Sequence, residues 1–245
     1  MIGVAIGRGE IESTDVPLLS FFDDYDTSGV DERLRQATLD DLLTMRTGIE
    51  WHESDRPLDE TNTTIQLEAA EDWIQFTLDQ PMDDAPGERW VYNSGGSHLM
   101  SGIIKKATGR YIDEYAEEYL FAPLGIDDYH WKKTPKGFPD TEGGLYLQAE
   151  QLAKIGYLYL HGGVWDGQRH PGVSADRRDQ QLESLRRLAV VDPRAFRSGV
   201  AGVRRVPRKV YPGSENMITN EHVARLSVMP LLVRCLSPNP SDPLV

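Results

Sequence analysis

The large aromatic side chains of this sequence are concentrated in its first two thirds. Residues 1–168 contain 19 of the 21 phenylalanines, tryptophans and tyrosines, and the last 77 residues contain only Phe196 and Tyr211. Aromatic residues bury the largest areas in protein cores, so residues 169–245 would build a core poorly. We therefore predict one folded domain over residues 1–168 and an atypical arginine-rich tail over residues 169–245.

The balance of charge changes sign at the same boundary. The whole chain has a net charge of −13, but residues 1–168 carry 13 basic and 32 acidic side chains, whereas residues 169–245 carry 13 basic and 7 acidic ones. One interpretation of the tail is a basic arm that contacts an acidic partner. The interpretation that we favour is a segment that is poorly ordered or outside its native reading frame, because the aromatic content falls at the same point.

The overall composition excludes several classes of protein. A strongly acidic protein repels nucleic acid and anionic lipid, so we expect no nucleic-acid partner. No apolar run approaches the ~20 residues of a membrane-spanning helix, so we expect no membrane span. Cys235 is the only cysteine, which leaves no internal disulfide and no cysteine-rich metal site.

Two short patterns are similar to metal-binding motifs but lack essential ligands. Asp24 to Gly29 resembles the first half of a calcium-binding EF-hand loop, yet the twelfth position, which should be glutamate, is Arg35. His52-Glu53 lacks the second histidine of a zinc-protease helix. We therefore expect no metal site and no cofactor, and we interpret residues 24–29 as an acidic, solvated loop.

Hydrophobic periodicity predicts a helix-rich chain with few strands. Residues 1–9 have the pattern of the end of an apolar helix, and Asp166-Gly167 is typical of a hairpin turn. Thr38 is expected to cap one helix and Gly109 to end another. The predicted helices are Asp15–Phe22, Thr38–Met45, Glu68–Thr77, Ser97–Ala107, Tyr111–Phe121 and Gln148–Leu160.

The segment Pro86–Met100 carries the most informative local pattern. Tyr92 stands two residues before Ser94, on a tight turn that leads into a predicted helix, and such a turn can aim a phenol and a hydrogen-bonding group at one point. Taken alone, the pattern also fits a half-buried aromatic residue and a turn serine. Ser97 lies in half of a Gly-x-Ser-x-Gly nucleophile motif, but Leu99 replaces the second glycine, so we interpret Ser97 as a helix cap.

Several segments share a pattern with one known family. They are Thr38–Ile49, Pro86–Gly109, Leu120–Ile126, Thr141–Leu147, Leu152–Leu160 and Gly163–Gln168. Together and in this order they resemble the class C β-lactamase-like serine hydrolases, which include penicillin-binding proteins, esterases and 6-aminohexanoate-dimer hydrolases. The resemblance covers about residues 1–168. It implies an α+β fold of the β-lactamase/transpeptidase type, with mostly its helical region present and its sheet incomplete, so residues 1–168 are expected to form a partial domain.

The resemblance also implies candidate site residues. In the family the nucleophile is the serine of a Ser-x-x-Lys motif, and its proton is shared by the lysine and by the tyrosine of a Tyr-x-Asn motif. A hydroxyl needs such a base to become a nucleophile, and a phenol with a pKa near 10 serves only beside a cation. Tyr92 matches the tyrosine, and Ser94 stands where the family has asparagine, which shortens the hydrogen-bonding group. The implied partner is a small-molecule amide or ester substrate.

The nucleophile motif is absent from this sequence, since none of the seven lysines has a serine or threonine three residues before it. Residues 2–11 resemble the continuation of the helix that begins with Ser-x-x-Lys, so the motif is expected just upstream of Met1. The Lys/His-x-Gly motif of a late strand is also missing, because His161-Gly-Gly follows a helix. We therefore expect a truncated, inactive hydrolase. The alternative is a non-catalytic remnant that binds a ligand or partner through its basic tail; substrate, compartment and oligomeric state stay open.

Overall fold

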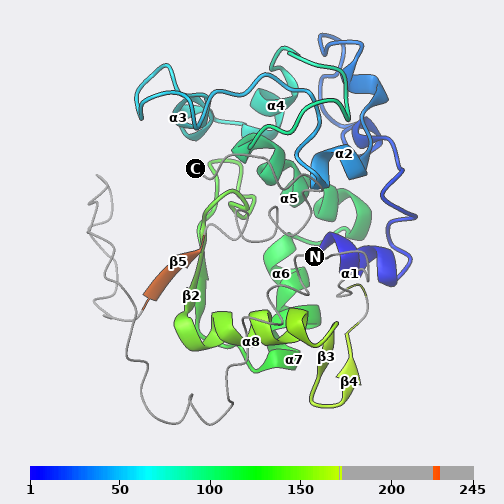
Figure 1. The fold of residues 1–245 in the computed structure, drawn as a ribbon, viewed down its shortest axis with the longest axis vertical. Helices are drawn as coiled ribbons and strands as arrows, with labels where there is room; N and C mark the ends of the chain where they lie inside the picture. The colour runs from blue at the N-terminus through cyan, green and yellow to red at the C-terminus, as the bar shows by residue number, and fades with distance from the viewer. Residues whose placement is uncertain (171, 173–222, 227–245) are drawn as a thin grey trace.

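The computed structural model describes residues 1–170, 172 and 223–226. Its longest described helix, α5 (Ser94–Thr108), lies within the helical part of the molecule (Figure 1). Around it pack α1 (Ile2–Gly7), the 3-10 helix η1 (Leu18–Phe21), α3 (Thr63–Ala69), α4 (Trp73–Leu78) and α6 (Ile112–Ala116). The predicted apolar helix end over residues 1–9 is confirmed by α1.

Helix α5 begins and ends at residues suited to those positions. Asn93 caps its start, and the Asn93 side chain accepts a hydrogen bond from the backbone of Gly96 at 2.6 Å. Gly109 ends it in the left-handed conformation, with φ 72°, as predicted. The interpretation of Ser97 as the cap is wrong, because the helix starts at Ser94 and Ser97 donates its hydroxyl to the Asn93 carbonyl from inside the helix.

Small and apolar residues allow α5 to be buried on several sides. At Gly102 the neighbouring helix approaches closely: a Cβ added there would lie 2.8 Å from Ile74 of α4 and 2.9 Å from Phe22. This part of the core is therefore built from α5, α4 and the segment after η1. The fully buried apolar residues of α5 are Leu99, Ile103 and Ile104.

The segment before α2 (Leu39–Leu43) combines one confirmed and one corrected prediction. Thr38 caps α2 in a capping box with Asp41, as the sequence indicated. The predicted helix Asp15–Phe22 is reduced to η1, because Pro17 is bridged to Thr38 and the Leu18 amide donates to Ala37. A further 3-10 helix, η2 (Leu34–Gln36), precedes α2.

The predicted helix Glu68–Thr77 is wrong, because the structure has two helices in its place. α3 ends at Ala69, and Asp72 starts α4 by accepting hydrogen bonds from the amides of Ile74 and Gln75, both at 3.1 Å. An aspartate that caps a new helix interrupts the apolar periodicity that appeared continuous in the sequence.

The remaining helices follow the sequence closely. The prediction over Tyr111–Phe121 corresponds to α6, a π-helical turn η3 (Glu117–Phe121) and α7 (Ala122–Leu124), which Gly125 ends with φ 60°. Pro123 lies at the start of α7, directly after the π-helical turn. The prediction over Gln148–Leu160 corresponds to α8 (Ala149–Leu160).

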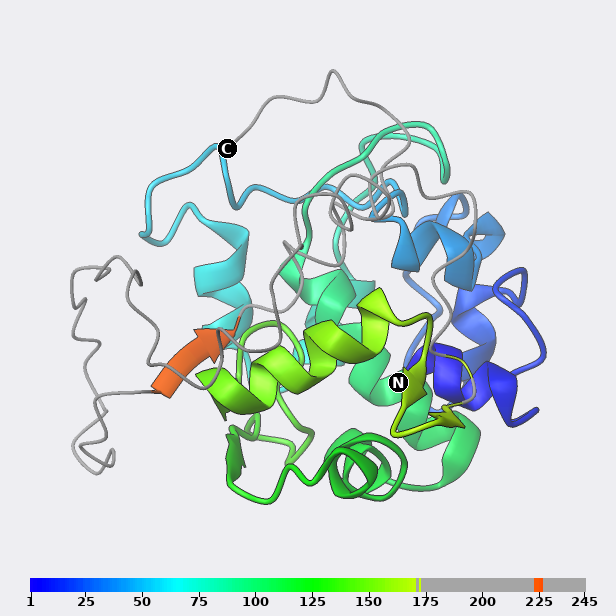
Figure 2. The same ribbon diagram turned by 60° about the horizontal axis from the view of Figure 1, so that its bottom comes forward.

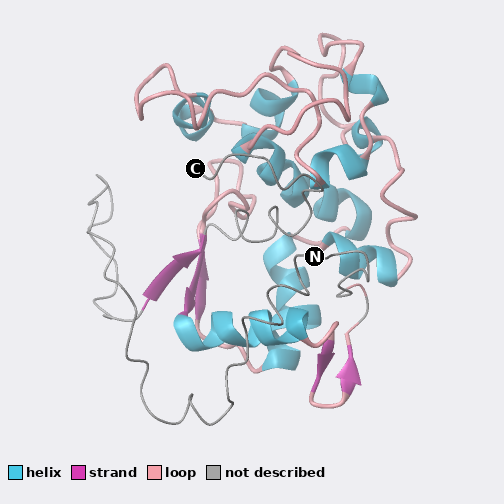
Figure 3. Cartoon of the chain, in the orientation of Figure 1, coloured by secondary structure: helices cyan, strands magenta, loops and turns pink. Residues whose placement is uncertain are grey.

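The described strands form two small antiparallel sheets (Figure 3). One has the order β1 (Tyr129–Trp131), β2 (Leu145–Gln148) and β5 (Val223–Leu226). Strand β5 lies in the predicted arginine-rich tail, whose sequence shows no alternating strand pattern, and it pairs with β2 from Leu226 opposite Leu145 to Val223 opposite Gln148. Four residues are too few to show alternation, and their partner lies far away in the sequence.

The second sheet is the hairpin of β3 (Val164–Trp165) and β4 (Gln168–Arg169). Its turn is the predicted Asp166-Gly167, with φ values of 47° and 76°. Helix α8 contacts both β2 and β3 and lies across the helical part between them (Figure 2). The predicted boundary after Gln168 falls inside β4, and most of the predicted tail lies outside the described residues. Within the described residues, no helix is long and apolar enough to cross a membrane.

Candidate functional site

The two candidate residues lie where an extended segment turns into α5. Tyr92 is half-buried in that segment, Asn93 caps the helix, and Ser94 is its first residue. Only 1% of Ser94 is exposed. The structure therefore places the phenol of Tyr92 and the hydroxyl of Ser94 in different environments, although two residues separate them.

The Ser94 hydroxyl is engaged by a carboxylate from another segment. Ser94 Oγ donates to Glu53 Oε1 at 2.9 Å, and the Ser94 amide donates to Glu53 Oε2 at 3.2 Å. Trp51 Nε1 donates to the same Oε2 at 3.0 Å. Glu53 thus accepts three hydrogen bonds, which suits a carboxylate, because it is an acceptor only and has about four lone-pair sites.

The first turn of α5 packs tightly against Trp51. A Cβ added to Gly95 would lie 2.5 Å from the Trp51 ring and 2.5 Å from Thr77 Oγ1. Only glycine allows this approach, and 4% of Trp51 is exposed. Glycine at position 95 therefore places the start of α5 close enough for Glu53 to reach Ser94.

The segments around Tyr92 and Glu53 run beside each other before they meet at Ser94. The amide of Val91 donates to the Met45 carbonyl at 2.9 Å, and the amide of Gly87 donates to the Arg46 carbonyl at 2.8 Å. Ile49 forms an isolated bridge with Met82. Two of the segments that carry the family pattern, residues 38–49 and 86–109, are therefore adjacent in the fold.

A third such segment reaches the same helix. Thr141 Oγ1 donates to the Ser97 carbonyl at 2.9 Å. The Asp140 side chain, with 1% of the residue exposed, accepts from the amides of Glu142 and Gly143 at 3.0 and 3.2 Å, which holds the loop that leads to β2. Three of the six family segments thus meet around the beginning of α5.

Two histidines near this region have opposite pKa shifts. Hydrogen bonds to Asp55 and Glu50 raise the pKa of His52, whose two ring nitrogens lie 2.9 and 3.1 Å from those carboxylates. Burial lowers the pKa of His98 to about 3, so this imidazole is neutral at pH 7. His98 packs edge-on against Trp73, with ring centroids 5.1 Å apart.

The lysines of α5 cannot serve as the cation that a tyrosine base requires. Lys105 lies eleven residues after Ser94, which corresponds to about 16 Å along a helix. Its ammonium donates to the Gly109 carbonyl and lies over the ring of Tyr111. Lys106 pairs with Asp23 and Asp24.

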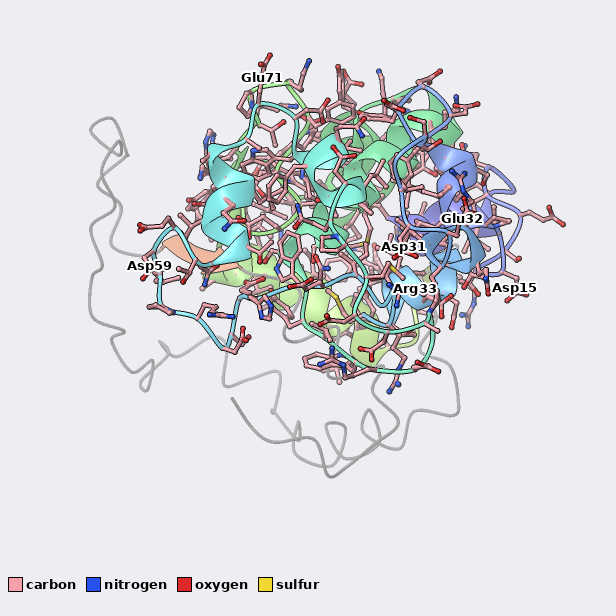
Figure 4. The ribbon with its side chains drawn as sticks, turned by 90° about the horizontal axis from the view of Figure 1, so that it is seen from above. Asp15, Asp31, Glu32, Arg33, Asp59 and Glu71 are labelled. Carbon is pink, nitrogen blue, oxygen red and sulfur yellow. The ribbon has the colours of Figure 1, made fainter. Side chains whose placement is uncertain are left out.

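The excess of acidic residues is distributed over different parts of the surface. Figure 4 shows Asp15, Asp31, Glu32 and Arg33 on one side of the molecule and Asp59 and Glu71 away from them. Arg33 bonds to Asp31 at 2.7 Å and lowers the pKa of that carboxyl to about 2, and it also donates to the Met82 carbonyl. Among the described residues, no group of three or more histidine, cysteine, aspartate or glutamate side chains is placed to hold a metal ion.

Comparison with known proteins identifies the family. Residues 25–209 match the sequence model of the family described as Beta-lactamase. The chain belongs to the beta-lactamase family. This confirms the family that the motifs indicated, and the match continues past Gln168; the division of the chain at that residue stays a prediction.

Relatives of this beta-lactamase family chain include transferases and hydrolases. It is 33% identical over 120 residues to monacolin J acid methylbutanoyltransferase of Aspergillus terreus, covering 48% of this chain and 28% of the relative. It is 31% identical over 99 residues to 6-aminohexanoate-dimer hydrolase of Paenarthrobacter ureafaciens, covering 40% of this chain and 25% of the relative. The matches thus span about a quarter of these relatives.

A solved structure shares the fold. A candidate 6-aminohexanoate-dimer hydrolase from Bacillus anthracis superposes with a TM-score of 0.56 at 20% identity, over 70% of this chain and 47% of that one. The likeness confirms the predicted α+β fold of the β-lactamase/transpeptidase type.

Sequence reasoning named Tyr92 and Ser94 as candidates, which stays a prediction, and missed Glu53, which bonds to Ser94. Glu53 was considered only as part of a failed zinc pattern, and it lies 41 residues before Ser94. Its local sequence gives no sign of the contact, which exists only because the segments 45–53 and 87–94 lie side by side.

Proposed function

We propose that this chain carries the tyrosine side of an acyl-transfer site, and that its 245 residues do not by themselves turn over an amide or an ester. The beta-lactamase family comprises hydrolases and acyltransferases. The role of Tyr92 is supported by its position in the family motif and by the convergence of three family segments at the start of α5.

In this proposal the complete site works through an acyl-serine intermediate. A serine hydroxyl attacks the carbonyl carbon of the substrate, its proton passes to the base that includes the Tyr92 phenolate, and the leaving amine or alcohol departs with a proton. Water or another acceptor then takes the acyl group. Tyr92 moves the proton, and the nucleophile must come from a Ser-x-x-Lys motif.

One observation carries the claim that this chain is insufficient for turnover. No Ser-x-x-Lys occurs in the sequence, and the serines on the first two turns of α5 are buried. The exposed fractions are 1% for Ser94, 0% for Ser97 and 0% for Ser101. A buried hydroxyl is out of reach of a substrate carbonyl, so none of them replaces the missing nucleophile.

Covalent labelling tests this proposal. The purified chain would be incubated with a fluorophosphonate and with a β-lactam, and its intact mass measured. We expect no adduct, and no hydrolysis of a chromogenic ester above the buffer rate. A stoichiometric adduct at any serine would show that the chain carries its own nucleophile and would refute its insufficiency.

Complementation tests the role of Tyr92. The chain would be mixed with a segment of the 6-aminohexanoate-dimer hydrolase relative that contains Ser-x-x-Lys. We expect labelling of that segment only when the chain is present, and its loss with Tyr92→Phe. Equal labelling with Tyr92→Phe would remove Tyr92 from the reaction.

The charge distribution favours a second candidate function, a non-catalytic chain that binds an acidic partner through residues 169–245. The balance of 13 basic to 7 acidic side chains there is its support. Polyglutamate is a suitable probe: salt-sensitive binding that is lost on deletion of residues 169–245 would support this function. Failure to bind polyglutamate at low salt would leave it without support.

A further inference from the structure

The carboxylate of Glu53 accepts hydrogen bonds from three donors. Trp51 Nε1, the Ser94 amide and the Ser94 hydroxyl all donate to it, at distances of 3.0, 3.2 and 2.9 Å. Two of these donors belong to the first residue of α5. The contact therefore joins the segment 51–53 to the start of the helix that follows Tyr92.

The backbone of Glu53 is held by residues at the start of α3. Its backbone carbonyl accepts a hydrogen bond from Asn62 Nδ2 at 2.9 Å, and Asn62 is fully buried. The neighbouring His52 exchanges two bonds with Thr63: its amide donates to Thr63 Oγ1 at 3.1 Å and its carbonyl accepts from the Thr63 amide at 2.9 Å. The start of α3 thus fixes the backbone that presents the carboxylate.

From these contacts we infer that Glu53 is a positioning residue for Tyr92. Val91, just before Tyr92, is bonded through its amide to the Met45 carbonyl, and Ser94, two residues after it, is bonded to Glu53. Both bonds end on the segment 45–53. The backbone of Tyr92 is therefore fixed on both sides to one support, which sets the point from which the phenol extends. The inference rests on the proposed function only in giving Tyr92 a role in proton transfer.

The same geometry assigns Ser94 a different role from Tyr92. The Ser94 proton is directed at Glu53, and 1% of the residue is exposed, so its hydroxyl does not contact a substrate. For the same reason Glu53 is not a general base for a nucleophilic Ser94. Of the two candidate residues, Tyr92 carries the chemistry, and Ser94 transmits the position that Glu53 sets.

The test reads the environment of the Tyr92 phenol directly. The full chain would be labelled with ¹³Cζ-tyrosine, and the Tyr92 resonance assigned by its loss in Tyr92→Phe. We expect Glu53→Ala to shift and broaden this resonance and to move the midpoint of its titration. Glu50→Ala removes a carboxylate from the same segment that bonds to His52 instead, and we expect it to leave the Tyr92 resonance unchanged.

Glu53→Gln separates position from charge. Its amide oxygen can accept from Trp51 and the Ser94 amide, while its NH₂ donates to Ser94 Oγ, because a hydroxyl can also accept. We expect this variant to restore the wild-type resonance. A Glu53→Gln spectrum like that of Glu53→Ala would overturn the inference in favour of an effect of charge.

An unshifted Tyr92 resonance in a cooperatively melting Glu53→Ala variant would also overturn the inference. If that variant does not melt cooperatively, Ser94→Ala decides, since it removes only the Oγ bond: a shifted resonance supports the inference and an unchanged one refutes it. These measurements need no substrate. A failure of the proposed function would appear in the complementation experiment while the Tyr92 resonance still responded to Glu53.

Discussion

The start of α5 and its second turn both bury polar atoms but differ in how those atoms are bonded. At the start, Asn93 Nδ2 is buried without a partner within the described residues, but Ser94 is fully bonded. Ser94 gives both its donors to Glu53. One turn later, His98 Nδ1, Ser101 Oγ and the facing Trp73 Nε1 are buried and, within the described part of the chain, have no hydrogen-bond partner. When a substitution removes one partner of a buried hydrogen bond, the other partner stays buried without a bond, and stability falls by its desolvation penalty. Removing a group that has no partner destabilises the protein little. The two regions should therefore respond in opposite ways to substitution.

The largest effect is expected at Glu53. Glu53→Ala leaves the Trp51 indole and the Ser94 amide without an acceptor, so the free energy of unfolding should fall by about 3 kcal/mol. Urea denaturation at pH 7 measures it, with Glu50→Ala as the control, which should change stability by less than about 0.5 kcal/mol. Equal losses in the two variants would mean that the contact between Glu53 and Ser94 does not stabilise the fold more than an exposed carboxylate does.

The next effect tests how closely the start of α5 must approach Trp51. Gly95→Ala places a Cβ within 2.5 Å of the Trp51 ring and of Thr77 Oγ1, so the helix must move away. We expect a loss of about 2 kcal/mol, the range for overpacking a core. Gly109→Ala would be a poor control because its φ is 72°, whereas Gly156→Ala, in α8 with no atom within 4 Å of the added Cβ, should be neutral or stabilising. A neutral Gly95→Ala would contradict the close packing.

What could be predicted from the sequence was local. The capping box at Thr38, the left-handed end of α5 at Gly109 and the Asp166-Gly167 turn depend on neighbouring residues, and all are observed. The break before Asp72 was also a local signal, but continuous apolar periodicity outweighed it. The Glu53–Ser94 contact and strand β5 were missed because both join residues far apart in the sequence.

The candidate site was predicted to the same extent. The Tyr92–Ser94 motif predicted a turn that leads into a helix, which is observed, but the sequence could not show that Ser94 faces inward. Burial of that hydroxyl depends on Trp51 and Glu53, which reach it only after the segments 45–53 and 87–94 have come together. A motif fixes the spacing of two side chains along the chain, and the direction of each is decided by its tertiary neighbours.

Acidification should lower the free energy of unfolding through His98, in the second turn of α5. The pKa of His98 is lowered to about 3 in the folded state by burial, against about 6.5 when unfolded. The unfolded state therefore binds the proton more readily below pH 6.5, and stability falls as the pH decreases from there toward 3. Between pH 7 and pH 5 this one group should remove about 2 kcal/mol.

His98→Leu isolates that contribution. Other titrating groups act equally in the wild type and in His98→Leu. The change in the free energy of unfolding from pH 7 to pH 5, compared between the two proteins, therefore reports His98 alone. We expect the wild type to lose about 2 kcal/mol more than the variant over this interval. Parallel losses would mean that His98 is protonated in the folded state and that a partner for its Nδ1 exists.

The smallest effect comes from two buried serines that lie one turn apart on α5. Ser97 Oγ donates to the Asn93 carbonyl at 3.2 Å, whereas Ser101 Oγ has no partner within the described residues, and both serines are 0% exposed. Ser101→Ala should leave the free energy of unfolding unchanged or raise it by up to about 1 kcal/mol, and Ser97→Ala should lower it by about 0.5–1 kcal/mol. Because helix propensity and burial are the same for the two substitutions, the difference in urea midpoint measures the hydrogen bond alone. A reversed order would mean that the second turn holds a partner for Ser101 and that the contrast between the two regions of α5 is false.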